Sequence, residues 1–186
     1  MSLTLPDLDR AWTFDDWPEL PDDGHRYEIV DGNLLVTPPP TQVHQIEAGA
    51  LRDQLFRAAP SGWRVVSELP LPLGPDHVRV PDVVVHRWPP HAPGSDPRNP
   101  VTVADVGLVV EVVSPRSRRT DRFAKPAEYA DAGIGLFWRL ETEPERVLHA
   151  FVLRSGRYEP VELVATRCAV PAPWGLVEVD VTALVG

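Results

Sequence analysis

The sequence predicts an α/β protein: a mixed central sheet flanked by helices, with one β-hairpin near the N-terminus and another near the C-terminus. Three observations lead to this fold class. The near-continuous apolar run at 105–113 is typical of a strand buried on both faces. Apolar residues at helical spacing follow Thr41. Two turn signals, Asp31-Gly32 and Ser155-Gly156, each lie between strand-like segments.

The expected elements follow in order along the chain. Residues 1–25 are a polar lead-in with one helical turn, and Asp31-Gly32 indicates the turn of a hairpin over 27–36. Thr41 is the predicted N-cap of a helix reaching about Ala59, with an apolar face of Ile46, Ala50, Leu51, Leu55 and Ala58. The remaining expectations are strands at 63–73, 79–88, 105–113 and 134–140, a proline-rich loop at 89–100, a helix at 121–132 ending at Gly133, a hairpin at 147–163, and a strand or helix at 174–185.

Length and composition set limits on the organisation and location of the protein. The chain has 186 residues, which fits a single domain over 1–186: lead-in 1–25, core 26–140 and C-terminal strands 141–186. The single cysteine, Cys168, excludes an internal disulfide and a cysteine-rich zinc site. No signal-peptide pattern and no apolar stretch of about 18 residues is present. We therefore expect a cytoplasmic protein with no membrane association.

The charge distribution bears on nucleic-acid binding. A formal net charge of −9 counts against nonspecific binding, which depends on basic side chains that neutralise phosphates. Carboxylates that hold metal ions are themselves acidic, however, and a local basic patch follows residue 115. Its members are Arg116, Arg118, Arg119 and Arg122. A solvated loop is the simpler interpretation of that patch.

Three ionisable residues stand out from their surroundings. Glu111 interrupts the apolar run. Burying a carboxylate there costs on the order of several kcal/mol of folding free energy, unless the carboxylate is paired, protonated or bound to metal. Asp82 lies among valines in the strand at 79–88. Lys125 is the single lysine among 18 basic residues, and lysine, unlike arginine, shifts its pKa readily. Taken alone, Asp82 is typical of a cap, Glu111 of an exposed strand edge and Lys125 of a solvated helix face. Their combination favours a catalytic site.

The combination predicts phosphodiester chemistry. If the two strands pair, Asp82 and Glu111 converge on one divalent cation such as Mg²⁺ or Mn²⁺, which takes one or two carboxylates plus water and phosphate oxygens. The cation lowers the pKa of a bound water and stabilises charge on the phosphate. Lys125 would orient or activate that water.

These residues lie in segments that resemble a known superfamily. The order Pro81-Asp82, then 111–115 (Glu-Val-Val-Ser-Pro), then 121–125 (Asp-Arg-Phe-Ala-Lys) resembles the PD-(D/E)XK nucleases, and more closely the Uma-two family of restriction endonucleases. The resemblance covers about 25–140 and includes 27–32 (Tyr-Glu-Ile-Val-Asp-Gly). It implies a restriction-endonuclease-like core and a metal-dependent endonuclease that cuts DNA, commonly as a homodimer.

The resemblance also implies roles for individual residues. Asp82, Glu111 and Lys125 match the catalytic positions, and Glu28 matches an acidic position that joins Asp82 and Glu111 as a metal ligand. The sequence departs from the superfamily pattern at Val113, where lysine is usual, and Lys125 takes its place on the following helix. Pro126 puts Lys125 at or near the N-terminus of that helix, with Asp121 as its N-cap.

Other residues receive structural interpretations. His44 is expected to be structural or to approach the site from the first long helix, and Tyr129, Phe137 and Trp138 are expected in the core. The alternative function is a catalytically inert nuclease-fold protein that acts as a binding or oligomerisation module. The acidic net charge and the Lys125-Pro126 junction favour this alternative, and the presence of all three candidate catalytic residues argues against it.

Overall fold

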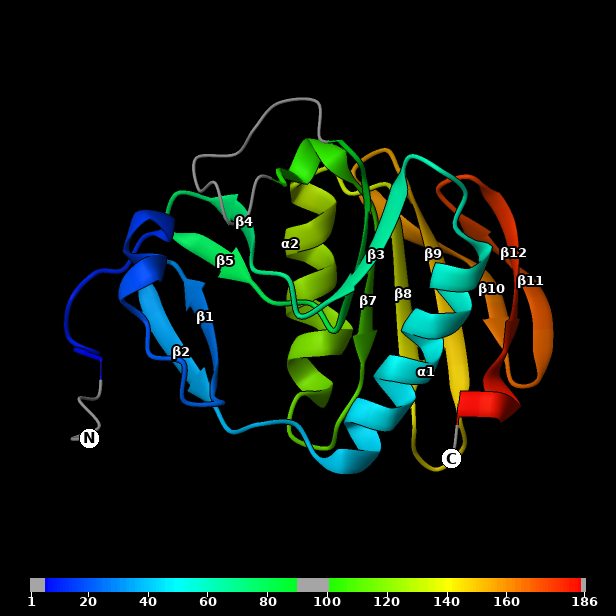
Figure 1. The fold of residues 1–186 in the computed structure, drawn as a ribbon, viewed down its shortest axis with the longest axis horizontal. Helices are drawn as coiled ribbons and strands as arrows, with labels where there is room; N and C mark the ends of the chain where they lie inside the picture. The colour runs from blue at the N-terminus through cyan, green and yellow to red at the C-terminus, as the bar shows by residue number, and fades with distance from the viewer. Residues whose placement is uncertain (1–5, 90–100, 185–186) are drawn as a thin grey trace.

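The computed structural model describes residues 6–89 and 101–184 and has the predicted mixed α/β architecture (Figure 1). A six-stranded sheet forms the centre. From edge to edge its strands are β10 (Arg157–Val164), β9 (Val147–Arg154), β8 (Leu136–Glu141), β7 (Val106–Val112), β6 (Val83–Arg87) and β3 (Trp63–Ser67). β7 and β8 pair in parallel, and the other neighbours are antiparallel. The predicted mixed sheet is therefore confirmed.

The parallel pair requires a crossover connection, which the chain supplies as a helix. α2 (Lys125–Asp131) and the preceding π-helical turn (Thr120–Ala124) connect β7 to β8. A parallel neighbour cannot be reached through a tight turn, so the helix must cross one face of the sheet. Gly133, with φ of 81°, ends the helix as predicted, because this conformation carries no Cβ penalty in glycine.

The N-terminal hairpin belongs to a separate four-stranded sheet. β1 (Arg26–Val30) pairs with β2 (Asn33–Thr37), and the sheet continues through β5 (His77–Arg79) to β4 (Leu71–Gly74). Asp31 and Gly32 both have positive φ, as the predicted two-residue turn requires. The lead-in packs here through a 3₁₀ helix (Phe14–Glu19) and the buried ring of Trp12.

α1 (Gln42–Ala58) covers one face of the central sheet (Figure 1). Thr41 caps it as predicted, because its side chain accepts a hydrogen bond from the backbone N–H of His44. The predicted apolar face is partly wrong. Ile46 is 42% exposed, whereas Glu47 is buried and pairs with Arg146 at 2.7 Å. The buried face runs through Ala48, Leu51 and Leu55, and the burial of Glu47 depends on a partner from a distant segment that periodicity does not reveal.

Alternating side chains of β6 and β7 point to opposite faces of the sheet. Leu108 and Val110 pack with α1, and Val109 packs with Tyr129 of α2. On the α1 face the core is completed by a two-stranded sheet, β11 (Arg167–Ala172) and β12 (Gly175–Asp180). Glu111, two residues after Val109, therefore belongs to the α2 face.

Two strands predicted as continuous are each broken in two. The segment 63–73 divides into β3 and β4, and 79–88 divides into β5 and β6, with each half in a different sheet. The breaks occur at Glu68, whose φ is 51°, and at Pro81-Asp82. Asp82 therefore lies just before a strand and not within one. Prolines, which cannot donate to a sheet ladder, stand at both breaks.

Lys125 is the first residue of α2, as predicted, but a π-helical turn precedes the helix. The N–H of Lys125 donates to the carbonyl of Thr120, five residues earlier, so Lys125 follows a π-helical turn. Asp121 lies inside this turn and is not an N-cap. Pro126 has no N–H to donate, which removes one α-helical hydrogen bond at this junction. Turns of this kind occur frequently at functional sites.

The C-terminal hairpin of β9 and β10 is confirmed, with Ser155 and Gly156 at positive φ in its turn. The predicted final strand or helix is both: β12 is followed by a 3₁₀ helix, Val181–Leu184. Its partner β11 was not predicted. The proline-rich loop falls, apart from Pro89, outside the described residues. Within the described residues, no helix has the length and apolar character needed to cross a membrane.

Gly107 provides a stability prediction. It lies at a bulge of β7, and a Cβ there would meet Pro173 Cγ at 2.6 Å and Trp63 Cζ3 at 2.8 Å. We expect Gly107→Ala to lower the free energy of unfolding by about 1–3 kcal/mol, because ring atoms in a packed contact must shift. Urea denaturation would measure this, with Gly135→Ala as the control, since a Cβ there meets nothing within 4 Å. Equal stability of both variants would contradict the prediction.

Candidate active site

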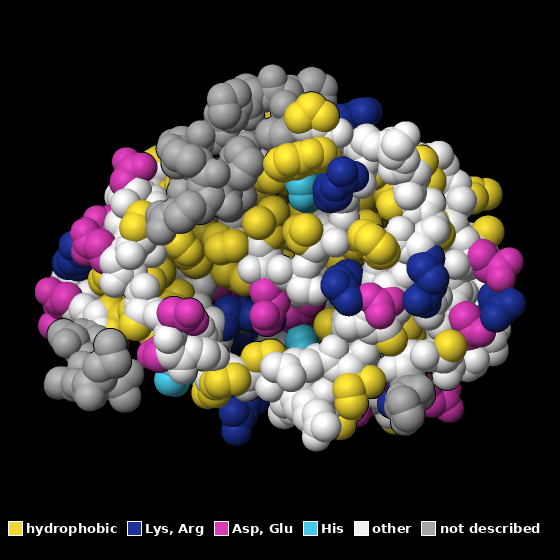
Figure 2. All heavy atoms as spheres, in the orientation of Figure 1, with side chains coloured by type: hydrophobic (Ala, Val, Ile, Leu, Met, Phe, Trp, Pro, Cys, Tyr) yellow, Lys and Arg dark blue, Asp and Glu magenta, His cyan; other side chains and the backbone are white. Residues whose placement is uncertain are grey.

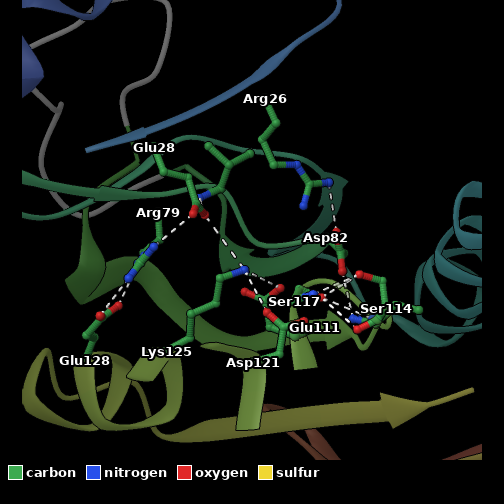
Figure 3. Close-up of polar contacts among 12 residues, drawn as sticks. Arg26, Glu28, Arg79, Asp82, Glu111, Ser114, Ser117, Asp121, Lys125 and Glu128 are labelled. Atoms are coloured by element: carbon green, nitrogen blue, oxygen red, sulfur yellow. Dashed lines mark hydrogen bonds and ion pairs between the residues drawn. The ribbon is translucent and has the colours of Figure 1, made fainter. Parts of the chain in front are cut away.

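The candidate residues meet where β6 begins and β7 ends (Figure 3). In the antiparallel register Val83 lies opposite Val110, so one further step places Asp82 opposite Glu111. Glu111 belongs to the face of the sheet that α2 covers, since the neighbouring Val110 and Val112 pack on the α1 side, whereas Asp82 lies just before β6 and also approaches His44 of α1. Strand pairing therefore brings these two carboxylates together, and the crossover helix places Lys125 above them.

Glu111 is almost completely buried, with 1% of its surface exposed. Tyr129 donates a hydrogen bond of 2.6 Å to Oε1, and the Lys125 ammonium donates one of 2.9 Å to Oε2. Burial raises the pKa of Glu111 to about 8, although the charge of Lys125 acts in the opposite direction. The carboxyl thus depends on added positive charge to stay ionised at neutral pH.

Lys125 lies among carboxylates from three elements. Besides Glu111, its Nζ is 3.2 Å from Asp121 Oδ1 and 3.8 Å from Glu28 Oε1. Burial disfavours the ammonium, but these carboxylates raise the pKa of Lys125 above its usual value. Lys125 is therefore charged at neutral pH and acts as a hydrogen-bond donor. Asp121, four residues before Lys125, lies on the same helical face.

Asp82 is held by groups from three other segments. Its Oδ2 accepts a hydrogen bond of 2.7 Å from the Val112 N–H and lies 3.3 Å from His44 Nε2, while Oδ1 lies 2.8 Å from an Arg26 nitrogen. Burial alone would raise the pKa of Asp82. The hydrogen bond from His44 and the charge of Arg26 outweigh it and hold that pKa below its usual value. Asp82 is accordingly an ionised carboxylate in a buried setting.

Glu28 joins the site from the N-terminal sheet. Its Oε1 accepts a hydrogen bond from the Val80 N–H at 3.1 Å, and its Oε2 accepts one from Arg79 at 2.9 Å. Arg79 also binds both oxygens of Glu128 at 2.7 Å each. Arg79 therefore ties β1 and α2 together behind the site.

A cleft of about 200 Å³ opens beside Asp82, between α1 and the break after β3. Figure 2 shows acidic, basic and histidine side chains close together near the centre of this face of the molecule. The polar and charged residues that line the cleft are Arg26, His44, Gln45, Arg52, Ser67, Glu68 and Asp82. The cleft gives a ligand access to one edge of the buried cluster.

The chemistry of the donors fits a hard divalent cation. Asp82, Glu111 and Glu28 supply carboxylate oxygens, the ligands that Mg²⁺ and Mn²⁺ prefer. Asp82 Oδ1 is buried and accepts no geometrically sound hydrogen bond from any described residue, which leaves a lone pair for a cation. As arranged, no three acidic, histidine or cysteine side chains in the described residues surround one point. Instead, the cationic groups of Lys125 and Arg26 contact these carboxylates.

The predicted site residues therefore come together: Asp82, Glu111, Lys125 and Glu28 form one buried cluster. Their catalytic and metal-binding roles stay predictions. Three further residues belong to this cluster and were given other roles or none: Arg26, Asp121 and Tyr129. The sequence spacing of each of the three residues from a predicted site residue could have indicated its place in the cluster. Arg26 and Glu28 share a strand face at i, i+2, and Asp121, Lys125 and Tyr129 share a helix face at i, i+4. His44 does approach the site, from α1.

Comparison with known proteins agrees with this fold. Residues 13–178 match the model of the Uma2 family, which is described as "Putative restriction endonuclease". The chain belongs to the Uma2 family. This family membership supports a nuclease-like function and, with it, nucleic-acid binding. The resemblance to restriction endonucleases inferred from the sequence is thereby confirmed.

A solved structure supports the family assignment at the level of the fold. The chain is similar to a protein of Anabaena variabilis described as a putative nuclease belonging to DUF820, with a TM-score of 0.69 and 18% sequence identity. The match covers 93% of this chain and 97% of that one. No curated protein matches the chain. At this identity the likeness shows a shared fold.

Proposed function

We propose that this Uma2-family chain is a Mg²⁺- or Mn²⁺-dependent endonuclease that hydrolyses phosphodiester bonds in DNA. One observation carries the proposal: Asp82, Glu111 and Lys125, from three separate segments of the chain, form a single buried cluster beside a cleft. Burying this many charges costs free energy that a purely structural role does not recover. Such perturbed groups gather preferentially at functional sites.

The residues would divide the reaction between them. Asp82 and Glu111, joined by Glu28, would hold the cation, which supplies an activated water and neutralises phosphate charge. Lys125, as a charged ammonium, would donate a hydrogen bond to the attacking water or to a phosphate oxygen. Tyr129 keeps Glu111 in place through its 2.6 Å hydrogen bond. The water oxygen would bond to phosphorus as one of its protons passes to bulk solvent, the bond to the leaving oxygen would break, and that oxygen would take up a proton from solvent.

The loop after β7 would contact the nucleic-acid backbone. Arg116, Arg118 and Arg119 are exposed there, directly beyond the strand end that carries Glu111. Exposed arginines bind phosphates and supply affinity that does not depend on sequence. We further propose that the chain is one domain, is cytoplasmic and acts as a homodimer, since a duplex has two strands to cut.

The alternative function, a catalytically inert binding or oligomerisation module, is favoured by one specific observation. Arg26 and Lys125 pair with the carboxylates that would hold a cation, so charge is already partly balanced without one. An inert module would need neither a cation nor Glu111. The two functions therefore make opposite predictions for metal binding.

The decisive experiment follows plasmid and single-stranded DNA cleavage while Mg²⁺ or Mn²⁺ is titrated. We expect cleavage that requires the cation and that falls about 10³-fold in Glu111→Gln, because this variant keeps the shape but loses a charged ligand. Glu159→Gln is the control, since its side chain is 55% exposed and pairs at the surface with Arg154. Absence of cleavage, with no cation binding by calorimetry, would establish the inert module instead.

A further inference from the structure

Arg26 makes a close contact to Oδ1, the oxygen of Asp82 that Val112 does not bind. One guanidinium nitrogen lies 2.8 Å from Asp82 Oδ1 and 2.6 Å from Glu68 Oε1 (Figure 3 shows the contact with Asp82). Asp82 is buried, whereas the Arg26 side chain is 16% exposed and lines the cleft. Arg26 thus stands between the buried carboxylate and the opening through which a ligand would arrive.

This contact is a close charge pair with poor hydrogen-bond geometry. Asp82 Oδ1 is buried and has no partner in the described residues that satisfies hydrogen-bond geometry, although Arg26 is within 2.8 Å. Asp82 Oδ2, in contrast, accepts a well-formed bond from Val112 N–H. One oxygen of Asp82 is therefore fixed by the protein, and the other is held only by charge.

The anchor on the other side of Arg26 is also unusual. Glu68 has φ of 51°, a left-handed conformation that costs about 1 kcal/mol or more in a residue with a side chain. Its carboxylate is 51% exposed, so solvent screens its hold on Arg26. The guanidinium therefore donates its well-formed hydrogen bond, of 2.6 Å, to a half-exposed carboxylate, and its contact with Asp82 is a charge pair alone.

We propose that Arg26 is an exchangeable counter-ion of Asp82: it holds Oδ1 in the metal-free protein, yields that oxygen to a divalent cation, and then binds a phosphate of the nucleic acid in the cleft. This inference rests on the proposed nuclease function and deepens it. A cation and a guanidinium compete for the same oxygen, because their charges repel. Once displaced, the planar guanidinium offers the paired donors that match phosphate oxygens.

Calorimetric titration with Mn²⁺ alone tests the first half of the proposal. In Arg26→Met the competitor is absent, so we expect Mn²⁺ to bind about tenfold more tightly than in the wild type, as close charge pairs permit. Arg52→Met is the matched control, because Arg52 lines the same cleft but pairs with Asp53 and not with Asp82. It measures how much a lost positive charge nearby raises affinity without direct competition.

Cleavage kinetics test the second half. We expect Arg26→Met to lower kcat/KM about 100-fold despite its tighter cation binding, because the phosphate loses a charge-assisted contact. Arg26→Gln provides a second variant if Arg26→Met fails to fold, since its neutral amide still reaches towards Asp82. Thermal melting without metal shows which variant is folded.

Each outcome has one meaning. Tighter Mn²⁺ binding in Arg26→Met than in Arg52→Met, together with slower cleavage, supports the exchange. Mn²⁺ binding by Arg26→Met but not by the wild type supports it as well. If wild type and Arg26→Met bind Mn²⁺ equally, the exchange is wrong and the nuclease function still stands. If neither binds, both proposals fail. Tighter binding with undiminished cleavage would overturn the phosphate contact.

Discussion

Lys125→Met is expected to lower the rate of DNA cleavage about 10³-fold and the free energy of unfolding by about 3–5 kcal/mol. Methionine fills the same volume but removes the ammonium, which lies within 4 Å of Glu111, Asp121 and Glu28. Three buried carboxylates then lack their shared counter-ion. Both losses follow from one charge, because the same ammonium balances the cluster and would contact the water or phosphate.

A conservative variant and a metal titration separate the two losses. Lys125→Arg keeps the charge but replaces a compact ammonium by a planar fork, so it should restore much of the stability and little of the cleavage. Mn²⁺ should raise the melting temperature of Lys125→Met more than that of the wild type, since the cation supplies the missing charge. Full cleavage by Lys125→Met would exclude Lys125 from the reaction.

Arg79→Met is expected to lower the free energy of unfolding by about 3–5 kcal/mol, because it strips a partner from a buried carboxylate. The Arg79 side chain is 3% exposed and binds Glu28 and both oxygens of Glu128. Glu28, itself buried, would retain the Val80 N–H and a distant Lys125. The loss also loosens β1 from α2, so cleavage should fall as well.

Arg122→Met is the matched control for Arg79→Met. Arg122 also binds both oxygens of one glutamate, Glu141, at 2.9 and 2.8 Å, but its side chain is 35% exposed. Water screens such a pair, so its loss should cost less than about 1 kcal/mol. Urea denaturation of the two variants compares the same geometry in two environments. Equal losses would mean that burial does not decide the strength of the Arg79 contacts.

Much of the fold was predictable from local patterns. The turn signals at Asp31-Gly32 and Ser155-Gly156 identified both hairpins, because few residues adopt positive φ. Thr41 identified the start of α1, and the apolar run at 105–113 identified the buried strand. The burial of Glu47 was not predictable, since its partner Arg146 lies 99 positions later. The breaks at Glu68 and Asp82 were missed because propensity alone does not show a change of sheet.

For the site, the sequence determined which residues are anomalous, and the tertiary structure determined what each one contacts. A glutamate in a valine-rich strand and a solitary lysine are visible in the sequence, since their cost or rarity needs no coordinates. Strand register places Asp82 opposite Glu111, the π-helical turn directs Lys125 towards them, and a hairpin from another sheet adds Arg26 and Glu28. Contacts between distant segments depend on register and helix rotation, which long-range packing sets and local spacing does not encode.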